Sequence, residues 1–424
     1  MPSFDAIVIG AGPAGLSAAR TAARLGLRTV VLERLAQAGE LAHPCGAAMS
    51  PVPGFVSGRW EDGGIHYPEL NLTLPASFVV GTPTSMRYVS PGGHEIRATF
   101  PSGERFPIAV VDKPALLRLL AEQAQAAGAE LRFGVRVTGL LEEGSRIAGV
   151  RTSAGELRAP VTLSAEGINR RLTEAAGLYA DAPPVRRYAF IASEDLEAPA
   201  ARAEDVDQVI TLGRRYTSAG APGVGTLLIP TAGRATVYFS IFSSQPRLQA
   251  DQPLEFYLNE YKERDPRVRE FLAGARVLRR AGCRIVVRAA PKRVVRDGFM
   301  GLGDSVIPGG QSGIVTAMFL GQEAARVAAQ AVRAGDTSTA GLAPYDRLFH
   351  GPILRGVETE GAIMMALTDM SDDEIDRVCQ TMSTMNMEPF FFGETGPIVR
   401  ETLRWTVREF PRIVRDWRLI RRMF

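Results

Sequence analysis

The stretch from Phe4 to Arg34 constrains this chain more than any other. A short apolar run ends at Gly10, and Gly12 and Gly15 complete a G-x-G-x-x-G motif that opens a helix of small residues. A second apolar run follows and ends at Glu33. In such a unit the first glycine permits a tight turn, the second lets backbone N–H groups approach a pyrophosphate, and the third lets the helix lie close to the strand. The pattern therefore predicts a strand–helix–strand unit that binds a dinucleotide.

The start of the helix and the end of the second strand indicate how a dinucleotide would be bound. The helix is expected over 14–25, beginning at Ala14 directly after Pro13, and a helix N-terminus offers unpaired N–H donors and partial positive charge to phosphates. The carboxylate of Glu33 can accept hydrogen bonds from the ribose hydroxyls of adenosine, and it would repel a 2′-phosphate. We expect these residues, together with Arg34, to contact the cofactor.

A second glycine-rich segment runs from Gly301 to Ile314. An expected strand delivers Asp304, whose carboxylate can hydrogen-bond a ribityl chain, and a helix begins near Gly313. The positive end of that helix would stabilise the negative edge of a reduced flavin ring. Two separated phosphate and ribityl loops favour FAD over NAD as the cofactor. The residues expected to contact FAD here are Gly303, Asp304, Pro308, Gly310, Gln311, Ser312, Gly313 and Ile314.

Charge and cysteine content exclude several classes of protein. The net charge of +3 over 424 residues is too small to indicate nucleic-acid binding. Cys45, Cys283 and Cys379 are far apart and form no C-x-x-C, which argues against a disulfide framework, a zinc site or a cysteine-ligated iron–sulfur cluster. The histidines show no metal-binding spacing, so we expect no metal. With no signal-peptide pattern and no apolar run that could span a bilayer, we expect a cytoplasmic protein.

The remaining patterns predict an α/β fold, with a Rossmann-like FAD-binding domain interleaved with an antiparallel-sheet substrate domain, plus a helical C-terminal region. After Pro183-Pro184, apolar runs recur at the spacing of an antiparallel sheet, and a helix is expected over 254–273. Residues 52–74 read as polar, turn-rich chain. The expected boundaries are an FAD-binding domain in three parts (1–74, 112–184 and 291–344), a substrate-side β segment (75–111), a substrate domain (185–290) and the C-terminal region (345–424).

The order of these motifs resembles that of a known group. The N-terminal fingerprint, a helix that starts at Lys113, a strand that ends in Ala165-Glu166-Gly167 and the second glycine-rich segment are arranged as in FAD-dependent enzymes with the p-hydroxybenzoate-hydroxylase type of fold. More narrowly, His43-Pro44-Cys45-Gly46 is similar to the Lys-Pro-Cys-Gly loop of the geranylgeranyl reductase family. The resemblance implies reduction of isolated C=C bonds in prenyl chains of lipids or chlorophylls, with a small-molecule prenyl-lipid substrate.

The resemblance also implies site residues. Cys45 and Gly46 would lie beside the flavin as catalytic residues, and the Cys45 thiol or water would give a proton to the alkene carbon that receives no hydride. The alternative is that Cys45 is a small buried residue of the loop. The residues of this part of the chain that would contact FAD are Cys45, Gly46, Ala47, Lys113, Val137, Glu166 and Gly167.

Three positions depart from the family pattern. Glu166-Gly167 replaces an Asp-Gly pair and offers a carboxylate one methylene longer. Lys113 stands where the family has an arginine, and a lysine cannot make the bidentate contact. The strand Gly225–Pro230 has aliphatic side chains where the family has the rings of Tyr-x-Trp-x-Phe-Pro, so we expect it to keep the substrate cavity apolar.

The electron donor and the reaction leave alternatives open. No second strand–G-x-G-x-x-G–helix unit occurs in the sequence, so the donor would be NAD(P)H that docks transiently or a ferredoxin-like protein. One rival function is an FAD-dependent monooxygenase that hydroxylates an aromatic compound or a polyketide. Another is a flavoprotein that carries electrons to a membrane quinone.

The sequence pattern of the C-terminal segment 398–424 predicts an amphipathic helix. Apolar residues recur at close to the helical period, and eight arginines occupy the other positions. This composition fits either a helix that lies in the plane of a membrane surface or an ordinary helix that packs on the protein. Pro411 is expected to kink or divide it. We therefore expect this segment to be the candidate for peripheral contact with the inner face of the membrane.

Overall fold

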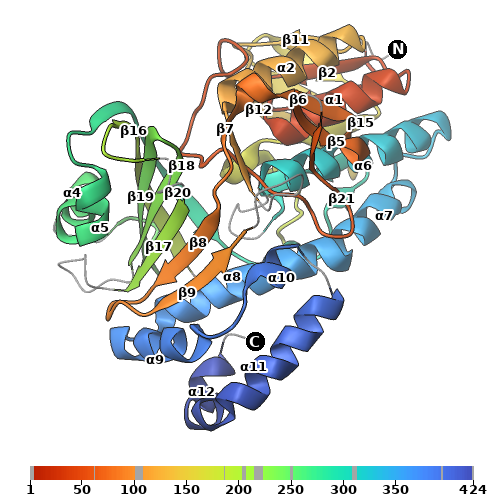
Figure 1. Ribbon diagram of the computed structural model, residues 1–424. Helices are drawn as coiled ribbons and strands as arrows, with labels where there is room; N and C mark the ends of the chain where they lie inside the picture. The colour runs from red at the N-terminus through yellow and green to blue at the C-terminus, as the bar shows by residue number, and fades with distance from the viewer. Residues whose placement is uncertain are drawn as a thin grey trace.

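Two large sheets, one mostly parallel and one mostly antiparallel, form the two lobes of the molecule, and the C-terminal helices lie below both (Figure 1). The computed structural model describes residues 4–61, 63–100, 108–185, 187–202, 207–213, 223–248, 252–307, 313–392 and 395–422. The α/β fold class predicted from the sequence is confirmed.

The six-stranded sheet carries the N-terminal fingerprint. Its strands, in spatial order, are β11 (Glu130–Arg132), β2 (Thr29–Leu32), β1 (Ala6–Ile9), β15 (Val161–Ser164), β22 (Phe299–Gly301) and β21 (Val295–Arg296). All but β21 run parallel, and every residue of β1, β2 and β15 is buried. Continuous apolar runs are typical of parallel strands that helices cover on both faces.

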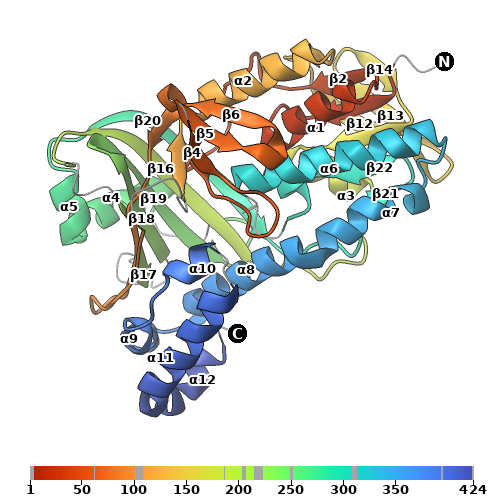
Figure 2. The same ribbon diagram turned by 45° about the vertical axis from the view of Figure 1, so that its right-hand side comes forward.

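Three helices and a small meander complete this lobe. They are α1 (Pro13–Arg24), α2 (Lys113–Ala126), α6 (Ile314–Arg333) and the strands β12 (Val137–Glu143), β13 (Arg146–Thr152) and β14 (Gly155–Arg158). Helices α1 and α6 lie side by side (Figure 2). A methyl group at Gly321 would stand 2.1 Å from the carbonyl oxygen of Ala14, so only glycine allows this close crossing.

Residues 52–74 hold a sheet that the sequence patterns did not reveal. The strands β4 (Arg59–Glu61), β5 (Gly64–Tyr67) and β6 (Leu72–Pro75) pair in antiparallel order, and Ile65, Tyr67 and Leu74 are fully buried. Each strand has only three or four residues, too few for alternation to stand out among the turns. A further small sheet joins β3 (Ala48–Met49), β10 (Ala109–Val111) and β7 (Val79–Gly81).

The second lobe is a seven-stranded sheet. Its spatial order is β20 (Arg276–Val287), β16 (Arg187–Ala198), β19 (Gly233–Ser243), β18 (Gly223–Thr231), β17 (Asp207–Gly213), β8 (Ser85–Val89) and β9 (Glu95–Thr99). Strands β8 and β9 come from the 75–111 segment, and β8 runs parallel to β17. The sequence analysis missed β20 because four arginines within its first nine residues hid its alternation.

Two helices cover the face of this sheet that points away from the other lobe (Figure 1). The helix expected over 254–273 is in fact α4 (Leu254–Arg264) and α5 (Pro266–Phe271), so that expectation was wrong. Pro266 cannot continue a helix but suits its first position. The carboxylate of Asp265 accepts the N–H of Arg267 at 3.0 Å and so begins α5.

The C-terminal region is helical, as expected. It contains α7 (Thr339–Leu348), a π-helical turn (Phe349–Ile353), α8 (Leu354–Asp369), α9 (Asp372–Met382), α10 (Glu388–Phe392), α11 (Thr395–Arg415) and α12 (Trp417–Ile420). Pro411 does not divide α11, and the break falls at Asp416 instead. Pro411 and Val407, whose carbonyl loses its helical donor, are both exposed, so water can satisfy that carbonyl. Within the described chain no helix is long and apolar enough to cross a membrane.

Candidate functional site

The three fingerprint glycines differ in what surrounds them. A methyl group at Gly10, where φ is +96°, would stand 2.4 Å from the carbonyl oxygen of Ala165, and one at Gly15 would stand 1.9 Å from that of Gly10. A methyl group at Gly12 would meet nothing within 4 Å. Gly10 and Gly15 are therefore required by the fold itself. Gly12, the N-cap of α1, borders open space in front of the helix N-terminus, where a pyrophosphate fits.

Glu33 connects the end of β2 to the fingerprint loop. Its Oε2 accepts the N–H of Ala11 at 2.8 Å, and its Oε1 accepts the N–H of Leu35 at 2.9 Å. Each carboxylate oxygen can accept more than one hydrogen bond, so these bonds orient Glu33 and leave acceptor capacity for ribose hydroxyls. Arg34, the next residue, is exposed.

A buried lysine lies next to this loop region. Lys113 opens α2, and only 8% of its surface is exposed. Its ammonium group forms no hydrogen bond or ion pair with the described residues, and its nitrogen is not among the buried polar atoms that lack a partner, so it stays accessible to a ligand. The pKa of His43 is lowered to about 4 by burial and by the positive charges of Lys113, Arg279 and Arg34. His43 is therefore neutral, and its surroundings are strongly positive, as the phosphates of FAD would require.

The loop that contains Cys45 is fixed at both ends. Arg279 of β20 donates to the carbonyl of His43 at 3.2 Å, and Val111 of β10 donates to the carbonyl of Ala47 at 3.0 Å. Ala47 has a φ of +51°, a conformation unusual for a residue with a side chain, and its N–H points to the sulfur of Cys45 at 3.4 Å. Strained backbone of this kind is common at functional sites.

The carboxylate of the Glu166-Gly167 turn forms hydrogen bonds within the protein. The carboxylate of Glu166 accepts the N–H groups of Leu172 at 3.0 Å and Thr173 at 2.7 Å, and thereby caps α3 (Arg171–Ala175). Contact of Glu166 with FAD stays a prediction. Val137 is the first residue of β12, and its carbonyl accepts from Arg171 at 2.7 Å.

The second glycine-rich segment meets the first. Gly303 has a φ of +54°, and a methyl group there would stand 3.2 Å from the methyl group of Ala14. Gly313, with a φ of +68°, is the N-cap of α6, and Ile314 begins that helix. The predicted contacts of Pro308, Gly310, Gln311 and Ser312 lie outside the described residues. The N-termini of α1 and α6 thus belong to neighbouring segments, as one extended dinucleotide requires.

Arg170 connects three backbone segments near the second glycine-rich segment. The sequence analysis did not identify this residue. It is 1% exposed, and its guanidinium donates to the carbonyls of Asp304 at 3.0 Å, of Val286 at 3.1 Å and of Ile307. Arg170 therefore joins the turn after β15, the turn after β22 and the end of β20. In a chain with 49 basic residues, nothing in the sequence marks this arginine as different from the others.

A cavity of about 610 Å³ lies where the two lobes meet. Residues 42–43 and 168–169 line it from the FAD side, and Phe190, Cys283 and Arg284 line it from the second sheet. The charged residues among those of its lining that the structure describes are Arg34, Arg247 and Arg284, and none of them is a carboxylate. The described chain shows no group of three or more histidine, cysteine or acidic residues that could hold a metal.

The strand Gly225–Pro230 does not line a cavity as expected. Leu227 and Ile229 are buried in the core beneath α4, and a methyl group at Gly225 would clash with the ring of Tyr261 of α4 at 2.3 Å. The expectation was wrong for these positions because the register Gly225–Phe239 and Leu227–Val237 turns them toward α4. The face toward the FAD-binding lobe carries the alternate residues.

Two family models match the chain. One, described as FAD dependent oxidoreductase, matches residues 82–327, and a second, described as FAD binding domain, matches residues 5–50. The first covers more than half of the chain.

Curated relatives match almost the whole chain. The digeranylgeranylglycerophospholipid reductase 2 of Methanococcoides burtonii is 25% identical over 404 residues, which cover 90% of this chain and 89% of the relative. The corresponding reductase of Haloferax volcanii is 27% identical over 394 residues, with 90% and 89% covered. That of Thermoplasma volcanium is 24% identical, with 98% and 99% covered. These similarities confirm the resemblance seen in the His43–Gly46 loop and the flavin motifs.

Solved structures show the same fold. A geranylgeranyl bacteriochlorophyll reductase-like protein of Thermoplasma acidophilum superposes with a TM-score of 0.78 at 21% identity, covering 98% of this chain and 99% of the other. A halogenase in complex with FAD gives a TM-score of 0.66 at 14% identity, covering 89% and 79%. With the open space at Gly12, the unpartnered Lys113 and the paired helix N-termini, the residues present fit FAD, as predicted. The chain therefore belongs to the FAD dependent oxidoreductase family. It is an enzyme that uses FAD as its cofactor for oxidation and reduction.

Proposed function

We propose that this enzyme reduces isolated C=C bonds in the prenyl chains of a lipid or a related prenylated molecule. The observation that carries the proposal is the similarity, over about nine-tenths of the chain or more, to relatives named digeranylgeranylglycerophospholipid reductase. The Pro44-Cys45-Gly46 loop supports it, because the loop is fixed between the FAD-binding lobe and β20.

FAD would be held by the groups described above. Gly12 leaves room for the pyrophosphate, Lys113 supplies a positive charge, and Glu33 offers acceptors to the ribose. Reduced FAD, when bound, supplies the hydride for one alkene carbon. The remaining requirement is a proton for the other carbon, which the protein or water must provide.

The test is an anaerobic assay of the dithionite-reduced protein with prenyl lipids, quinones and aromatic compounds, read by mass spectrometry. Products that have gained two hydrogen atoms per double bond are expected from the prenyl lipids. Hydroxylated aromatic products or stoichiometric hydrogen peroxide in an aerobic assay with NAD(P)H would instead indicate a monooxygenase. Reoxidation by quinone without any alkene turnover would indicate an electron carrier.

For the electron donor we propose NAD(P)H rather than a ferredoxin-like protein. The cavity of about 610 Å³ between the lobes is large enough for part of a nucleotide, and its charged side chains are all arginines. Arg247 has no carboxylate partner among the described residues, and Arg284 donates at 2.7 Å to the carbonyl of Pro246. Phosphate groups are the natural partners of such arginines.

The donor proposal is tested by stopped-flow reduction of the bound flavin. Arg247→Gln should weaken the apparent affinity for NADPH about tenfold, as expected for the loss of one charged contact. Arg276→Gln is the matched control, because Arg276 lies at the far end of β20 and pairs with Glu197 at 2.7 Å. If neither NADPH nor NADH reduces the flavin but a reduced ferredoxin does, the donor proposal fails and the reductase proposal stands.

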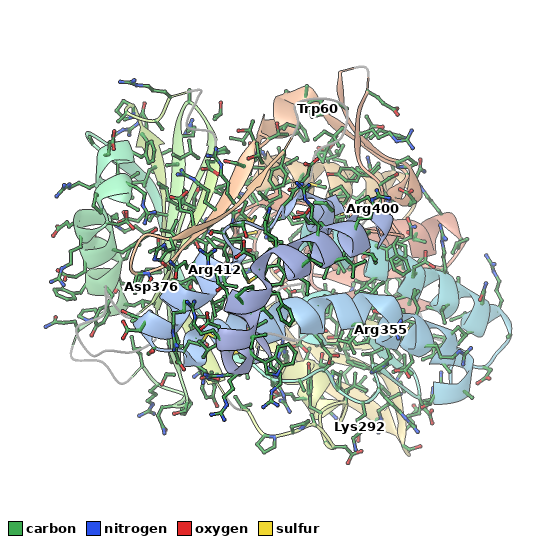
Figure 3. All side chains as sticks on the ribbon, turned by 60° about the horizontal axis from the view of Figure 1, so that its bottom comes forward. Trp60, Lys292, Arg355, Asp376, Arg400 and Arg412 are labelled. Carbon is green, nitrogen blue, oxygen red and sulfur yellow. The ribbon has the colours of Figure 1, made fainter. Side chains whose placement is uncertain are left out.

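We also propose that α11 rests on a membrane surface. Six of the nine large apolar side chains that the described chain exposes lie along α11 and α12, at 50% to 78% exposure. They are Val399, Leu403, Val407, Phe410, Val414 and Trp417. Figure 3 shows α11 across the front of the molecule, with Arg400 and Arg412 toward its two ends. An apolar stripe flanked by arginines suits the interface of an anionic bilayer, where a prenyl lipid would be met.

The membrane contact is tested by co-sedimentation with anionic liposomes at low and high salt. Val407→Glu combined with Phe410→Glu should abolish binding, since both side chains are more than half exposed on the stripe. Phe256→Glu, which alters an exposed apolar residue of α4, is the control and should bind like wild type. Failure of the wild-type protein to bind at low salt would refute the contact, with reductase activity assayed separately in detergent.

A further inference from the structure

The hydroxyl group of Tyr238 lies beside the Cys45 loop, on the face of the seven-stranded sheet opposite to α4 and α5. Its neighbours Val237 and Phe239 on β19 are buried in the core beneath α4, so Tyr238 points the other way. A methyl group at Gly46 would stand 3.3 Å from the Tyr238 hydroxyl. The hydroxyl therefore borders the loop that the proposed function places against the flavin.

This hydroxyl is buried, and it has no hydrogen-bond partner within the described structure. Nearby polar groups do have partners. Arg279 pairs with Asp195 at 3.3 Å, and Thr236 donates to Asp195 at 3.0 Å. A buried hydroxyl that makes no hydrogen bond costs free energy, so its retention calls for an explanation such as a ligand.

The surroundings of Tyr238 keep its proton in place. Burial raises the pKa of Tyr238 well above its ordinary value, and the Cys45 and Asp195 side chains raise it further, while Arg279 opposes them. The side chain is consequently a neutral hydrogen-bond donor at any pH at which the enzyme would work. A phenol with a raised pKa is a weak acid, so proton transfer from Tyr238 requires that the nearby Arg279 guanidinium stabilise the tyrosinate.

We propose that Tyr238, rather than Cys45 or water, is the proton donor for the reduced double bond, an inference that rests on the proposed reductase function. One alkene carbon accepts the hydride and its electron pair, which come from reduced FAD. The O–H bond of Tyr238 breaks and a C–H bond forms at the other carbon. The tyrosinate that results is stabilised by the nearby Arg279 guanidinium, and solvent water returns the proton, so that atoms and charge balance over the cycle.

The key variant is Tyr238→Phe, which removes only the hydroxyl oxygen. Turnover should fall about 100-fold or more, the range expected for loss of a general acid. FAD content and the rate of flavin reduction should stay unchanged. The matched control is Tyr261→Phe, because Tyr261 packs against Phe239 on the opposite face of the same sheet, with ring centroids 5.6 Å apart.

The Tm of the flavin-free protein distinguishes a proton-donating role of the Tyr238 hydroxyl from a role in stabilising the fold, without any activity assay. Because the Tyr238 hydroxyl is buried without a partner, removing it should leave the Tm of the flavin-free protein unchanged or higher. A hydroxyl that served the fold through a hydrogen bond would give a lower Tm in Tyr238→Phe. That result would overturn the proposal.

The pH profile and the Cys45→Ala variant complete the test. With Tyr238 as donor, the wild-type rate should be constant between about pH 6 and pH 9, where a phenol keeps its proton, and Tyr238→Phe should lower turnover much more than Cys45→Ala does. A rate that Cys45→Ala abolishes and Tyr238→Phe leaves intact would make Cys45 the donor. If the wild-type protein itself reduces no prenyl lipid, the proposed function fails, and this outcome is distinct from loss in Tyr238→Phe alone.

Discussion

The FAD-binding region, here called the cradle, and helix α11 both have groups without contacts in the protein, but the groups are polar in one and apolar in the other. The cradle comprises the fingerprint loop around Gly12 and the nearby Lys113. There, the N-terminus of α1 faces open space at Gly12, and the ammonium group of Lys113 has no carboxylate partner among the described residues. Along α11, apolar side chains lack cover, and Val407 is 78% exposed. The contrast teaches what each region binds, because a missing polar partner indicates a charged ligand and a missing apolar cover indicates an apolar surface.

The largest expected effect tests the open space at the cradle. Gly12→Val should abolish FAD binding, because the added side chain would occupy the place of the pyrophosphate. The flavin absorbance of the purified protein measures this directly. Gly356→Val in α8 is the control, since Gly356 also borders open space but lies outside the cradle. A normal flavin spectrum in Gly12→Val would contradict the placement of FAD.

The next effect compares the two faces of α11. Trp405 is 5% exposed, and its indole N–H donates to the carbonyl of Thr381 at 3.2 Å. Trp405→Ala should therefore lower the free energy of unfolding by about 3–5 kcal/mol. Phe410 is 59% exposed, so Phe410→Ala should change it by only about 0.5 kcal/mol. Chemical denaturation measures both, and equal losses would mean that the outer face of α11 is covered in solution.

Acid should destabilise the flavin-free cradle through His43. Its pKa is about 4 in the folded protein, so the unfolded chain binds a proton first as the pH falls. Stability should decline as the pH drops from about 6.5 toward 4, by at most about 3 kcal/mol from this group. Bound FAD brings negative phosphates that raise the pKa of His43, so the loss should be smaller with FAD.

Chemical denaturation of the His43→Asn variant between pH 7 and pH 4 measures how much of the acid-induced loss of stability comes from His43. The variant should show a flatter pH dependence than wild type. The same pH slope in His43→Asn and wild type would show that other groups cause the acid sensitivity.

The smallest effect concerns Lys113, and it should appear only in the binding of FAD. Lys113→Met removes a charge that has no ion-pair partner among the described residues, so the flavin-free protein should be about as stable as wild type. The Kd for FAD should rise about 10- to 100-fold, as expected for the loss of a charged contact. Titration of the flavin-free protein with FAD measures the second effect. A lower Tm without FAD would mean that Lys113 serves the fold.

The sequence predicted the cradle far better than its surroundings. The glycines at 10, 12 and 15 and the helix ends are local features, since each requirement is met within a few residues. FAD and the oxidoreductase class followed from them and are confirmed. The individual FAD contacts and the domain boundaries stay predictions.

What the sequence could not reveal depends on tertiary register. The face on which Tyr238 lies is set by the pairing of β19 with β16 and β18, and a shift by one residue would reverse it. The same pairing turns Leu227 away from the FAD-binding lobe. Arg170 shows another limit, because the three carbonyls that it joins lie 116 to 137 residues away along the chain.

The order of strands in the parallel sheet has a consequence for how the protein is made. Strand β22, which pairs with β15, is synthesised only after the whole seven-stranded sheet. On the ribosome, the N-terminal fingerprint emerges roughly 300 residues before its partner segment at Gly303. Chains grow from the N-terminus, and non-local pairing is slow. FAD loading is therefore a late step of biogenesis, and an incomplete chain that ends before β22 is expected to emerge without flavin.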